Sequence, residues 1–518
     1  MKKILLTCMA LFCAAACIDA QQGLSAEDDP AVRQYLAEQG MDEDENGQES
    51  AYVKKEKIVP AAKRPQPPAA DKVQAVTEAN LEHASQKYTD ECTDTFLYGI
   101  EDQISEMLDT LTKEEDPRFM EEAYDLFQKT KSPVVRQKIL AYFTKLKDPC
   151  LEDYAVTVIN DPYDEKRDTV SACFSYVAAV KTADAIPGAV DLVDKDDEQY
   201  FDAALNCLGE IGTDDEAVFL SEYIERDDLT KAQKQSLVRV LGKLKAVATY
   251  EKVAELAEDE NQDSFVRMYA AEAIGAMKVP EAEEVLLDLF ESRDANLRAS
   301  VVKGMKNFDD QAAVQLLIEA LRDSQYKVRL EAVTAVDELD IKDAVPYLVY
   351  RCKDNGEQQQ VKDKCYDVIA KLNTAEGNEY LVGLITGKKT GDTTKGKVAA
   401  SLLKYNYAGS QEIVALAGET LKNDIQKKLR YTLGKEFAKY GRPEYAGVCA
   451  EFIASKDVMT QGTGLDIYAK GRYAEVTAAV QALADSEADG KKKSRNVNVR
   501  KAKRILGIDP DAAEDADN

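Results

Sequence analysis

Side chains that could carry out acid–base or metal chemistry are unevenly represented in this sequence. The chain of 518 residues has 95 Asp and Glu residues but a single histidine, His83. Zinc hydrolases need several imidazole ligands, and Ser-His or Cys-His nucleophiles need an imidazole beside the attacking atom. His83 lies ahead of the repeated part of the chain, and carboxylates at this density adjoin one another by chance. We therefore predict no catalytic residue, no metal site and no cofactor.

Cysteine is the second reactive side chain to consider. Beyond Cys17 the sequence has seven cysteines: Cys92, Cys150, Cys173, Cys207, Cys352, Cys365 and Cys449. None of them forms the Cys-x-x-Cys spacing of a zinc knuckle or a redox dithiol. The candidate disulfide is Cys352 with Cys365, because the first ends a predicted helix and the second lies near the start of its antiparallel partner. The alternative is that all seven are buried free thiols.

A cluster of basic side chains lies near the end of a chain whose net charge is −28. Eight Lys and Arg residues occur between positions 490 and 504, without any acid: Lys491, Lys492, Lys493, Arg495, Arg500, Lys501, Lys503 and Arg504. This patch could bind an anionic lipid or an acidic protein. The alternative is that it pairs with the acidic tail, residues 509–518, and with neighbouring acidic helices. Over the rest of the surface the acidity would repel a phosphate backbone, so no nucleic-acid partner is predicted.

The first 20 residues have the pattern of a bacterial export signal. Met-Lys-Lys is followed by an apolar core from Ile4 to Ala16, which is too short to remain as a membrane-spanning helix. Cleavage after Ala20 would leave a soluble protein. Cleavage before Cys17, where Ala14-Ala-Ala-Cys resembles a relaxed lipobox, would leave a lipidated cysteine. We predict an exported protein, either periplasmic or anchored to a membrane as a lipoprotein.

Residues 21–83 are predicted to form a disordered tether. They lack apolar periodicity, carry both acidic and basic runs, and contain a proline-rich spacer from Pro60 to Pro68. Residues 84–116 have helical character and are expected to cap the part of the chain that follows.

From 117 to 508 the chain repeats one short unit, in which an acidic residue precedes a helix that opens with an apolar residue and an arginine. The clearest copies are residues 263–267, 294–298 and 323–329. The arginines that end these copies stand 31 and 31 residues apart: Arg267, Arg298 and Arg329. A unit of about 30 to 35 residues accommodates two helices and two turns. Because one such hairpin cannot bury its apolar faces, neighbouring hairpins must stack. The prediction is an all-α solenoid of about twelve helical hairpins.

The repeated pattern Asp-x-x-Val-Arg-x-x-Ala, which residues 263–270 match in full, resembles the HEAT repeat in the short form of phycobilisome-lyase-type repeats. The resemblance covers residues 117–508. It implies that the Val belongs to the core and that the Arg reaches the Asp of the turn, which makes these pairs a structural ladder. It also implies that the second helix of each hairpin lines a concave inner surface.

The resemblance further predicts a candidate partner-binding strip on three consecutive second helices. Offsets of three and six from the first motif residue are expected to point away from the core. The residues concerned are Tyr269, Glu272, Ser300, Lys303, Glu331 and Thr334. Ordinary solvated helix surface would explain the same residues.

Together these features favour a non-catalytic scaffold of the bacterial cell envelope, which binds one or more proteins along the concave face of the solenoid. An alternative is a lipid-anchored structural linker between the membrane and the cell wall or a surface assembly. A third hypothesis, a repeat-based lyase-like enzyme, has only the repeat type in its favour. Any contact with a membrane would be made by a lipid on Cys17 or by the basic patch.

Overall fold

The computed structural model describes residues 52–80, 83–226, 228–486 and 497–508. Within these ranges the regular elements are all helices, and no strand occurs. Internal contacts divide the chain into two compact units, unit 1 up to Val285 and unit 2 from Leu286 onward. The predicted all-α class is confirmed.

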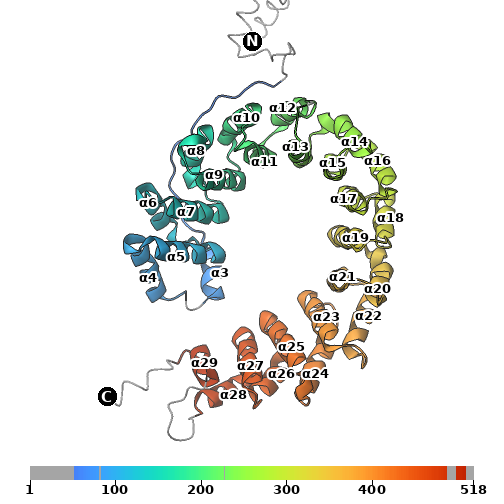
Figure 1. Ribbon diagram of the computed structural model, residues 1–518. Coiled ribbons are helices and arrows are strands. Elements are labelled where there is room, and N and C mark those ends of the chain that lie inside the picture. The colour runs from blue at the N-terminus through green and yellow to red at the C-terminus, as the bar shows by residue number, and fades with distance from the viewer. Residues whose placement is uncertain (1–51, 81–82, 227, 487–496, 509–518) are drawn as a thin grey trace, which may run out of the picture. The chain divides into compact units, whose positions relative to one another are not determined.

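Unit 1 contains the helices α3 to α15 (Figure 1). Their bounds are α3 Ala70–Ala79, α4 Gln86–Tyr98, α5 Glu101–Glu114, α6 Met120–Lys129, α7 Pro133–Leu146, α8 Glu152–Asn160, α9 Arg167–Val180, α10 Ile186–Asp194, α11 Phe201–Ile211, α12 Asp214–Ile224, α13 Lys231–Leu244, α14 Tyr250–Glu258 and α15 Ser264–Met277. Single 3₁₀ turns precede several of them: η2 Pro117–Phe119, η3 Pro149–Leu151, η4 Pro162–Asp164, η5 Ala183–Ala185 and η6 Val247–Thr249.

The division between the units falls within α16, Pro280–Phe290. Unit 2 continues with α17 Ala295–Met305, α18 Gln311–Ala320, α19 Tyr326–Glu338, α20 Val345–Lys353, α21 Gln359–Leu372, α22 Ala375–Thr386, α23 Asp392–Tyr405, α24 Ser410–Thr420, α25 Lys427–Tyr440, α26 Ala446–Ile453, α27 Val458–Gly471, α28 Ala474–Ala484 and α29 Val497–Ile505. Its 3₁₀ turns are η7 Lys342–Ala344, η8 Asp424–Gln426 and η9 Pro443–Tyr445.

Successive helices form hairpins, and the hairpins stack in two layers within each unit. In unit 1 the second helices α5, α7, α9, α11, α13 and α15 pack each on the next, and in unit 2 the same holds from α17 to α29. The first helices, which carry even numbers, form the other layer (Figure 1). The 24 helices from α6 to α29 make twelve successive hairpins, so the predicted number is confirmed. The expected capping region contributes one more hairpin, α4 with α5.

The core lies between the two layers, where the repeat pattern predicts it. In α15 the residues Val266, Ala270 and Ile274 share one helical face and are fully buried. Second helices such as α7 end in a left-handed residue, here Lys147 with φ 58°. This conformation turns the chain sharply, so that the next first helix begins within a few residues.

The motif arginines bind differently from what the resemblance implies. Asp263 caps its own helix by accepting from the backbone N–H of Phe265, while Arg267 donates to the carbonyl of Ala257. In unit 2, Arg298 binds Asp323 of the following turn, with Nε to Oδ2 at 2.7 Å. Arg329 likewise binds Glu357, 28 residues further on. The ladder is therefore real in unit 2, but the carboxylate that each arginine binds belongs to the next turn, and in its own turn the arginine donates only to backbone carbonyls, such as that of Ser292 for Arg298 and that of Asp323 for Arg329.

None of the helices in the part of the chain that the structure describes is both long enough and apolar enough to cross a membrane.

Candidate functional site: an acidic track on unit 1

A segment without helix or strand, residues 52–69, lies against unit 1 and is called the strap below. It runs extended past α12, α10, α8 and α6 in that order, which is the reverse of their order in the sequence (Figure 1). Helix α3 follows it directly. The prediction of disorder is wrong for residues 52–80, because acidic side chains of unit 1 bind the basic ones of the strap. Residues 21–51 of the predicted tether lie outside the described residues.

The strap is bound by a row of acidic side chains that unit 1 presents at successive hairpins. We call this row the acidic track: Glu121, Asp125, Asp148, Glu152, Asp191, Asp194, Asp215 and Glu216. Each of the four first helices α6, α8, α10 and α12 contributes at least one of these carboxylates. The repeat spacing of the hairpins therefore becomes a spacing of charges along the strap.

The α12 end of the track is the driest. The side chain of Glu216 is 0% exposed, and its two oxygens have separate partners. Oε2 accepts from the N–H and hydroxyl of Thr213 at 2.9 and 2.7 Å, which completes the capping box of α12. Oε1 accepts from the strap, from Lys55 Nζ at 2.7 Å and from the Tyr52 hydroxyl at 3.1 Å.

Tyr52 is the aromatic anchor of the strap. It is buried, and its ring lies 5.2 Å from the ring of Phe219 on α12, centroid to centroid. Its pKa is raised, first by burial and then by the negative charge of Glu216. The hydroxyl therefore stays protonated and continues to donate to Glu216.

The electrostatics of Glu216 favour its ionised form. Burial by itself would raise the pKa of this carboxyl, but the hydrogen bonds from Lys55 and Thr213 outweigh burial and lower the pKa below 4.5. For Lys55, burial opposes the charged form, whereas its bonds to Glu216 and Asp215 raise its pKa above 10.5. Both partners are charged over the whole neutral range.

The middle of the track binds three lysines. Lys57 Nζ donates to Asp191 Oδ2 at 2.7 Å and to the carbonyl of Asn160 at 3.2 Å. Lys54 pairs with Asp194 at 2.8 Å. Lys63 pairs with Glu152 Oε2 at 2.8 Å, while the other oxygen of that carboxylate accepts from the Thr182 hydroxyl.

The α6 end of the track is the most exposed. Arg64 donates to both Glu121 and Asp125 at 2.8 Å, and its guanidinium lies 5.4 Å from the ring centroid of Tyr124. The Arg64 side chain is 62% exposed in this position. Next to it Pro65 is buried, and the N–H of Gln66 donates to Asp148.

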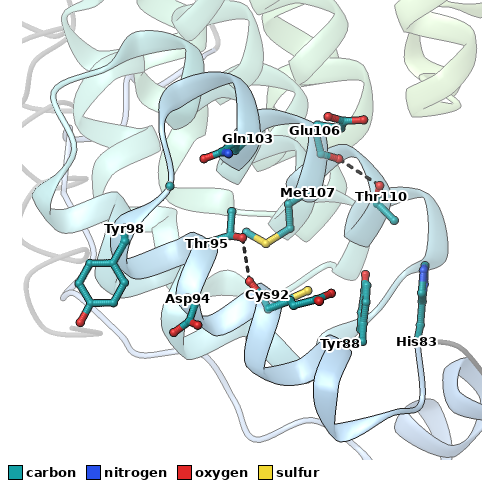
Figure 2. A pocket seen from close by; sticks show the side chains of 12 residues that line it. His83, Tyr88, Cys92, Asp94, Thr95, Tyr98, Gln103, Glu106, Met107 and Thr110 are labelled. Carbon is teal, nitrogen blue, oxygen red and sulfur yellow. Dashed lines mark hydrogen bonds between the residues drawn. The ribbon is translucent and has the colours of Figure 1, made fainter. Parts of the chain in front are cut away.

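A pocket of unit 1 lies between α4 and α5, and Figure 2 shows its lining. The His83 ring stacks on that of Tyr88 with centroids 4.0 Å apart, and His83 Nδ1 lies 2.7 Å from Glu114 Oε2. The hydroxyls of Thr95 and Thr110 donate to carbonyls of their own helices, as the dashed lines show. His83 is thus held by its neighbours Tyr88 and Glu114.

The strip predicted on the second helices is only partly at the surface. Tyr269 and Glu272 lie half-buried on α15, with the guanidinium of Arg239 5.3 Å from the Tyr269 ring centroid. In unit 2, Lys303 and Glu331 pair at 3.9 Å, and Thr334 donates to the carbonyl of Leu330. Ser300 on α17 is 1% exposed, so its assignment to the strip is wrong. Its small side chain is buried among the packed helices of unit 2. Nothing in the geometry sets the remaining five apart as a binding site.

The predicted disulfide is not formed in this structure. All seven described cysteines are buried free thiols. Cys352 and Cys365 nevertheless lie together as expected, since a hydrogen bond with Cys352, together with burial, raises the pKa of the Cys365 thiol. Among the described residues, no group of three or more His, Cys, Asp and Glu side chains could hold a metal ion.

The predicted basic patch is described only in part. Lys491, Lys492, Lys493 and Arg495, like Cys17 and the acidic tail, lie outside the described residues. Lys501 on α29 pairs with Asp466 at 2.6 Å and donates to the carbonyl of Gly462. Arg500, Lys503 and Arg504 lie on the same helix.

Reasoning from the sequence missed the strap and the track. One usable signal was present: five basic residues between positions 54 and 64 stand in a chain of net charge −28. A second was the Thr213-x-x-Glu216 capping box, which marks the start of α12. Neither signal indicates which surface the basic residues would meet.

Comparison with known proteins agrees with this architecture. Residues 96–505 match the family described as spirochaete HEAT repeat protein. No curated protein matches the chain. Among solved structures, Kap121p is similar over 84% of this chain at 10% identity, with a TM-score of 0.38, and the chain covers 57% of its length. Human deoxyhypusine hydroxylase is similar over 45% of this chain and 99% of its own, at 16% identity with a TM-score of 0.22. These two likenesses are too distant to carry an argument about function.

Proposed function

The chain belongs to the family of spirochaete HEAT repeat proteins, and from that premise we propose that it is a non-catalytic scaffold of the bacterial cell envelope that binds other proteins along its helical repeats. Stacked hairpins of this kind commonly serve as surfaces for protein binding.

One observation carries the proposal. The acidic track of unit 1 already holds 18 residues of polypeptide, 52–69, in an extended form across four hairpins. The contacts are mainly side-chain ion pairs, with two buried anchors, Tyr52 and Pro65, and one backbone hydrogen bond from Gln66 to Asp148, and they do not require a helix or strand in the bound segment. A surface that binds its own chain in this way has the chemistry to bind other extended chains.

The assignment to the envelope is supported by the first 20 residues, which have the composition of an export signal. Two forms of the mature protein remain as proposals, a soluble periplasmic protein and a lipoprotein anchored through Cys17. The alternative function, a lipid-anchored linker, requires the lipid on Cys17 as its attachment to the membrane.

Location and lipid are tested together in cells that produce the protein naturally. Fractionation should place it in the envelope, and labelling with a fatty acid should mark the wild-type chain but not Cys17→Ser if it is a lipoprotein. A cytoplasmic protein would refute the envelope assignment. An unlabelled, processed chain would remove the linker alternative.

Partner binding is tested by chemical cross-linking in the same cells, followed by affinity purification and mass spectrometry. The wild-type chain is compared with Glu272→Lys and Lys303→Glu on the second helices, and with the pair Glu121→Lys and Asp125→Lys on the track. We expect a reproducible set of partners that at least one of these variants depletes. A set indistinguishable from that of an unrelated exported protein would refute the scaffold.

A further inference from the structure

Glu216 is a fully buried acid at a position where three other first helices have a small residue. It is the third residue of α12, and the same position in α16, α18 and α22 is held by Ala282, Ala313 and Gly377, which are buried. A small residue suits this position because it lies inside the hairpin. A fully buried carboxylate there is expensive unless each of its oxygens is satisfied.

Only one of its two oxygens is used by the helix itself. Oε2 completes the cap of α12 through Thr213, whereas Oε1 has Tyr52 and Lys55 of the strap as its partners. Glu216 Oε1 therefore faces away from α12. This oxygen is buried only when another segment of polypeptide covers it. That segment supplies a hydroxyl and, three residues later, an ammonium group.

The strap occupies this site through Tyr52 and Lys55. Its other ion pairs with the acidic track are exposed, so another basic segment can replace them. The other three lysines and the arginine of the strap are between 37% and 62% exposed. Pairs of this exposure contribute little and are screened by salt. What favours the strap is its covalent connection to unit 1, which gives it an effective concentration on the order of millimolar.

We propose that the acidic track of unit 1 is a docking site for an extended, lysine-rich segment of another protein, for which the strap is the intramolecular competitor. This inference rests on the proposed scaffold function and names the chemistry of a partner. The segment carries an aromatic hydroxyl followed three residues later by a lysine, as in Tyr52 and Lys55, and then further basic residues that match the acids of α10, α8 and α6.

A different protein fits this site better than a second copy of the chain does. The strap of another copy brings the same contacts as the one already in place, but at micromolar concentration and without the covalent connection. Exchange between copies therefore gains nothing. A partner displaces the strap only if it adds contacts beyond those that the strap makes.

The test uses a fluorescein-labelled peptide with the sequence of residues 52–69 and measures its anisotropy on the full-length chain. In the released variant, Tyr52→Ala with Lys55→Ala, the cis strap is weakened and the track is intact. We expect the peptide to bind this variant at least tenfold more tightly than it binds the wild-type chain. A scrambled peptide of equal charge should bind at least tenfold more weakly.

A matched pair of substitutions locates the binding. Glu216→Gln, added to the released variant, keeps an oxygen for the cap of α12 but turns a donor toward the peptide, and we expect binding to weaken about tenfold. Glu251→Gln, an exposed acid at the start of α14, should leave binding unchanged. Helical circular dichroism of each variant confirms that the fold is retained.

Three results would overturn the proposal: no binding to the folded released variant, equal binding of the scrambled peptide, or a concentration-dependent dimer of the wild-type chain in sedimentation. The last would make a second copy the occupant. The scaffold function would survive each of these results if the cross-linked partners of the wild-type chain persist, so the two failures can be told apart.

Discussion

Both units contain charge pairs that join successive layers, such as Arg136 with Glu165 in unit 1, and unit 1 has in addition the pairs of the acidic track with the strap. In unit 2, Arg329 donates to both oxygens of Glu357 at 2.7 and 2.6 Å, and the carboxylate is 0% exposed. In unit 1 the acidic track pairs with a segment that belongs to no hairpin, and most of its pairs are half exposed. A buried bidentate pair between successive layers fixes the stack, whereas an exposed pair with a covering segment can be exchanged.

The largest effect is expected from breaking the buried pair. Glu357→Ala leaves the Arg329 guanidinium buried without its carboxylate, so we expect unit 2 to lose roughly 3 to 5 kcal/mol of stability. Hydrogen exchange of α19 and α21 would report this loss, with the helices of unit 1 as the internal reference. The double variant Arg329→Met, Glu357→Leu should recover most of it, because the buried pair is then absent and Arg351, which also lies 3.7 Å from Glu357, keeps Asp354 at 3.6 Å as a partner. A loss below about 1 kcal/mol for Glu357→Ala would show that the ladder does not hold the layers together.

Removing the aromatic anchor of the strap should have the next largest effect. Tyr52→Ala removes the ring from its site beside Phe219 and the hydroxyl from Glu216. Burial of a side chain of this size is worth about 2 kcal/mol, so the strap should be open at least about tenfold more often. Trypsin cleavage after Lys57 should accelerate by the same factor, since cleavage follows the open population. Val53→Ala, at an exposed position of the same strap, should leave the cleavage rate unchanged.

Acidification should release the strap while Glu216 takes up a proton. The pKa of Glu216 is lowered in the docked state, so its contribution to docking is present above pH 4.5 and is lost as the pH falls through the lowered value. The raised pKa of Lys55 means that the alkaline limit lies above pH 10.5. The chain has no Trp, so Tyr52→Trp provides a single fluorescent reporter. Its emission should stay constant from about pH 5 to 10 and shift to the red below about pH 4.5, with a smaller shift when Glu216→Gln is added. An equal shift in both variants would assign the acid release to other groups, such as Asp191.

The smallest effect is expected at the exposed end of the track. Arg64→Ala removes two ion pairs and the contact with Tyr124, but the guanidinium is largely in water. We expect less than about a threefold change in trypsin cleavage after Lys57. An effect as large as that of Tyr52→Ala would mean that the two ends of the track hold the strap equally well. The buried contacts at Glu216 would then be no more important than the exposed pairs of Arg64.

Much of the fold could be predicted from local pattern. The recurrence of an apolar residue and an arginine placed the starts of α15, α17 and α19 correctly, because a buried position every three to four residues is a property of the helix itself. The number of hairpins followed from the same period. The partner of each motif arginine did not, since Asp263 binds its own helix and Arg298 reaches across to Asp323.

The candidate site was much harder to predict. Ser300 was expected at the surface from its offset, but its small side chain is buried where the hairpins of unit 2 pack closely. Residues 52–69 have the composition of a disordered linker, and their order depends on carboxylates between 57 and 164 residues further along the chain. The composition of a segment is a property of that segment alone, so it cannot predict which surface of the folded protein the segment binds.

The sequence by itself determined that this protein is a repeat of helical hairpins with one histidine and a large excess of acid, because helical periodicity and composition are local properties. Only the tertiary structure decided that four successive first helices present their acids in one row, that Glu216 turns one oxygen toward the strap, and that residues 52–69 lie across them. Those outcomes depend on the stacking distance between hairpins, which brings together side chains that have no relationship along the chain.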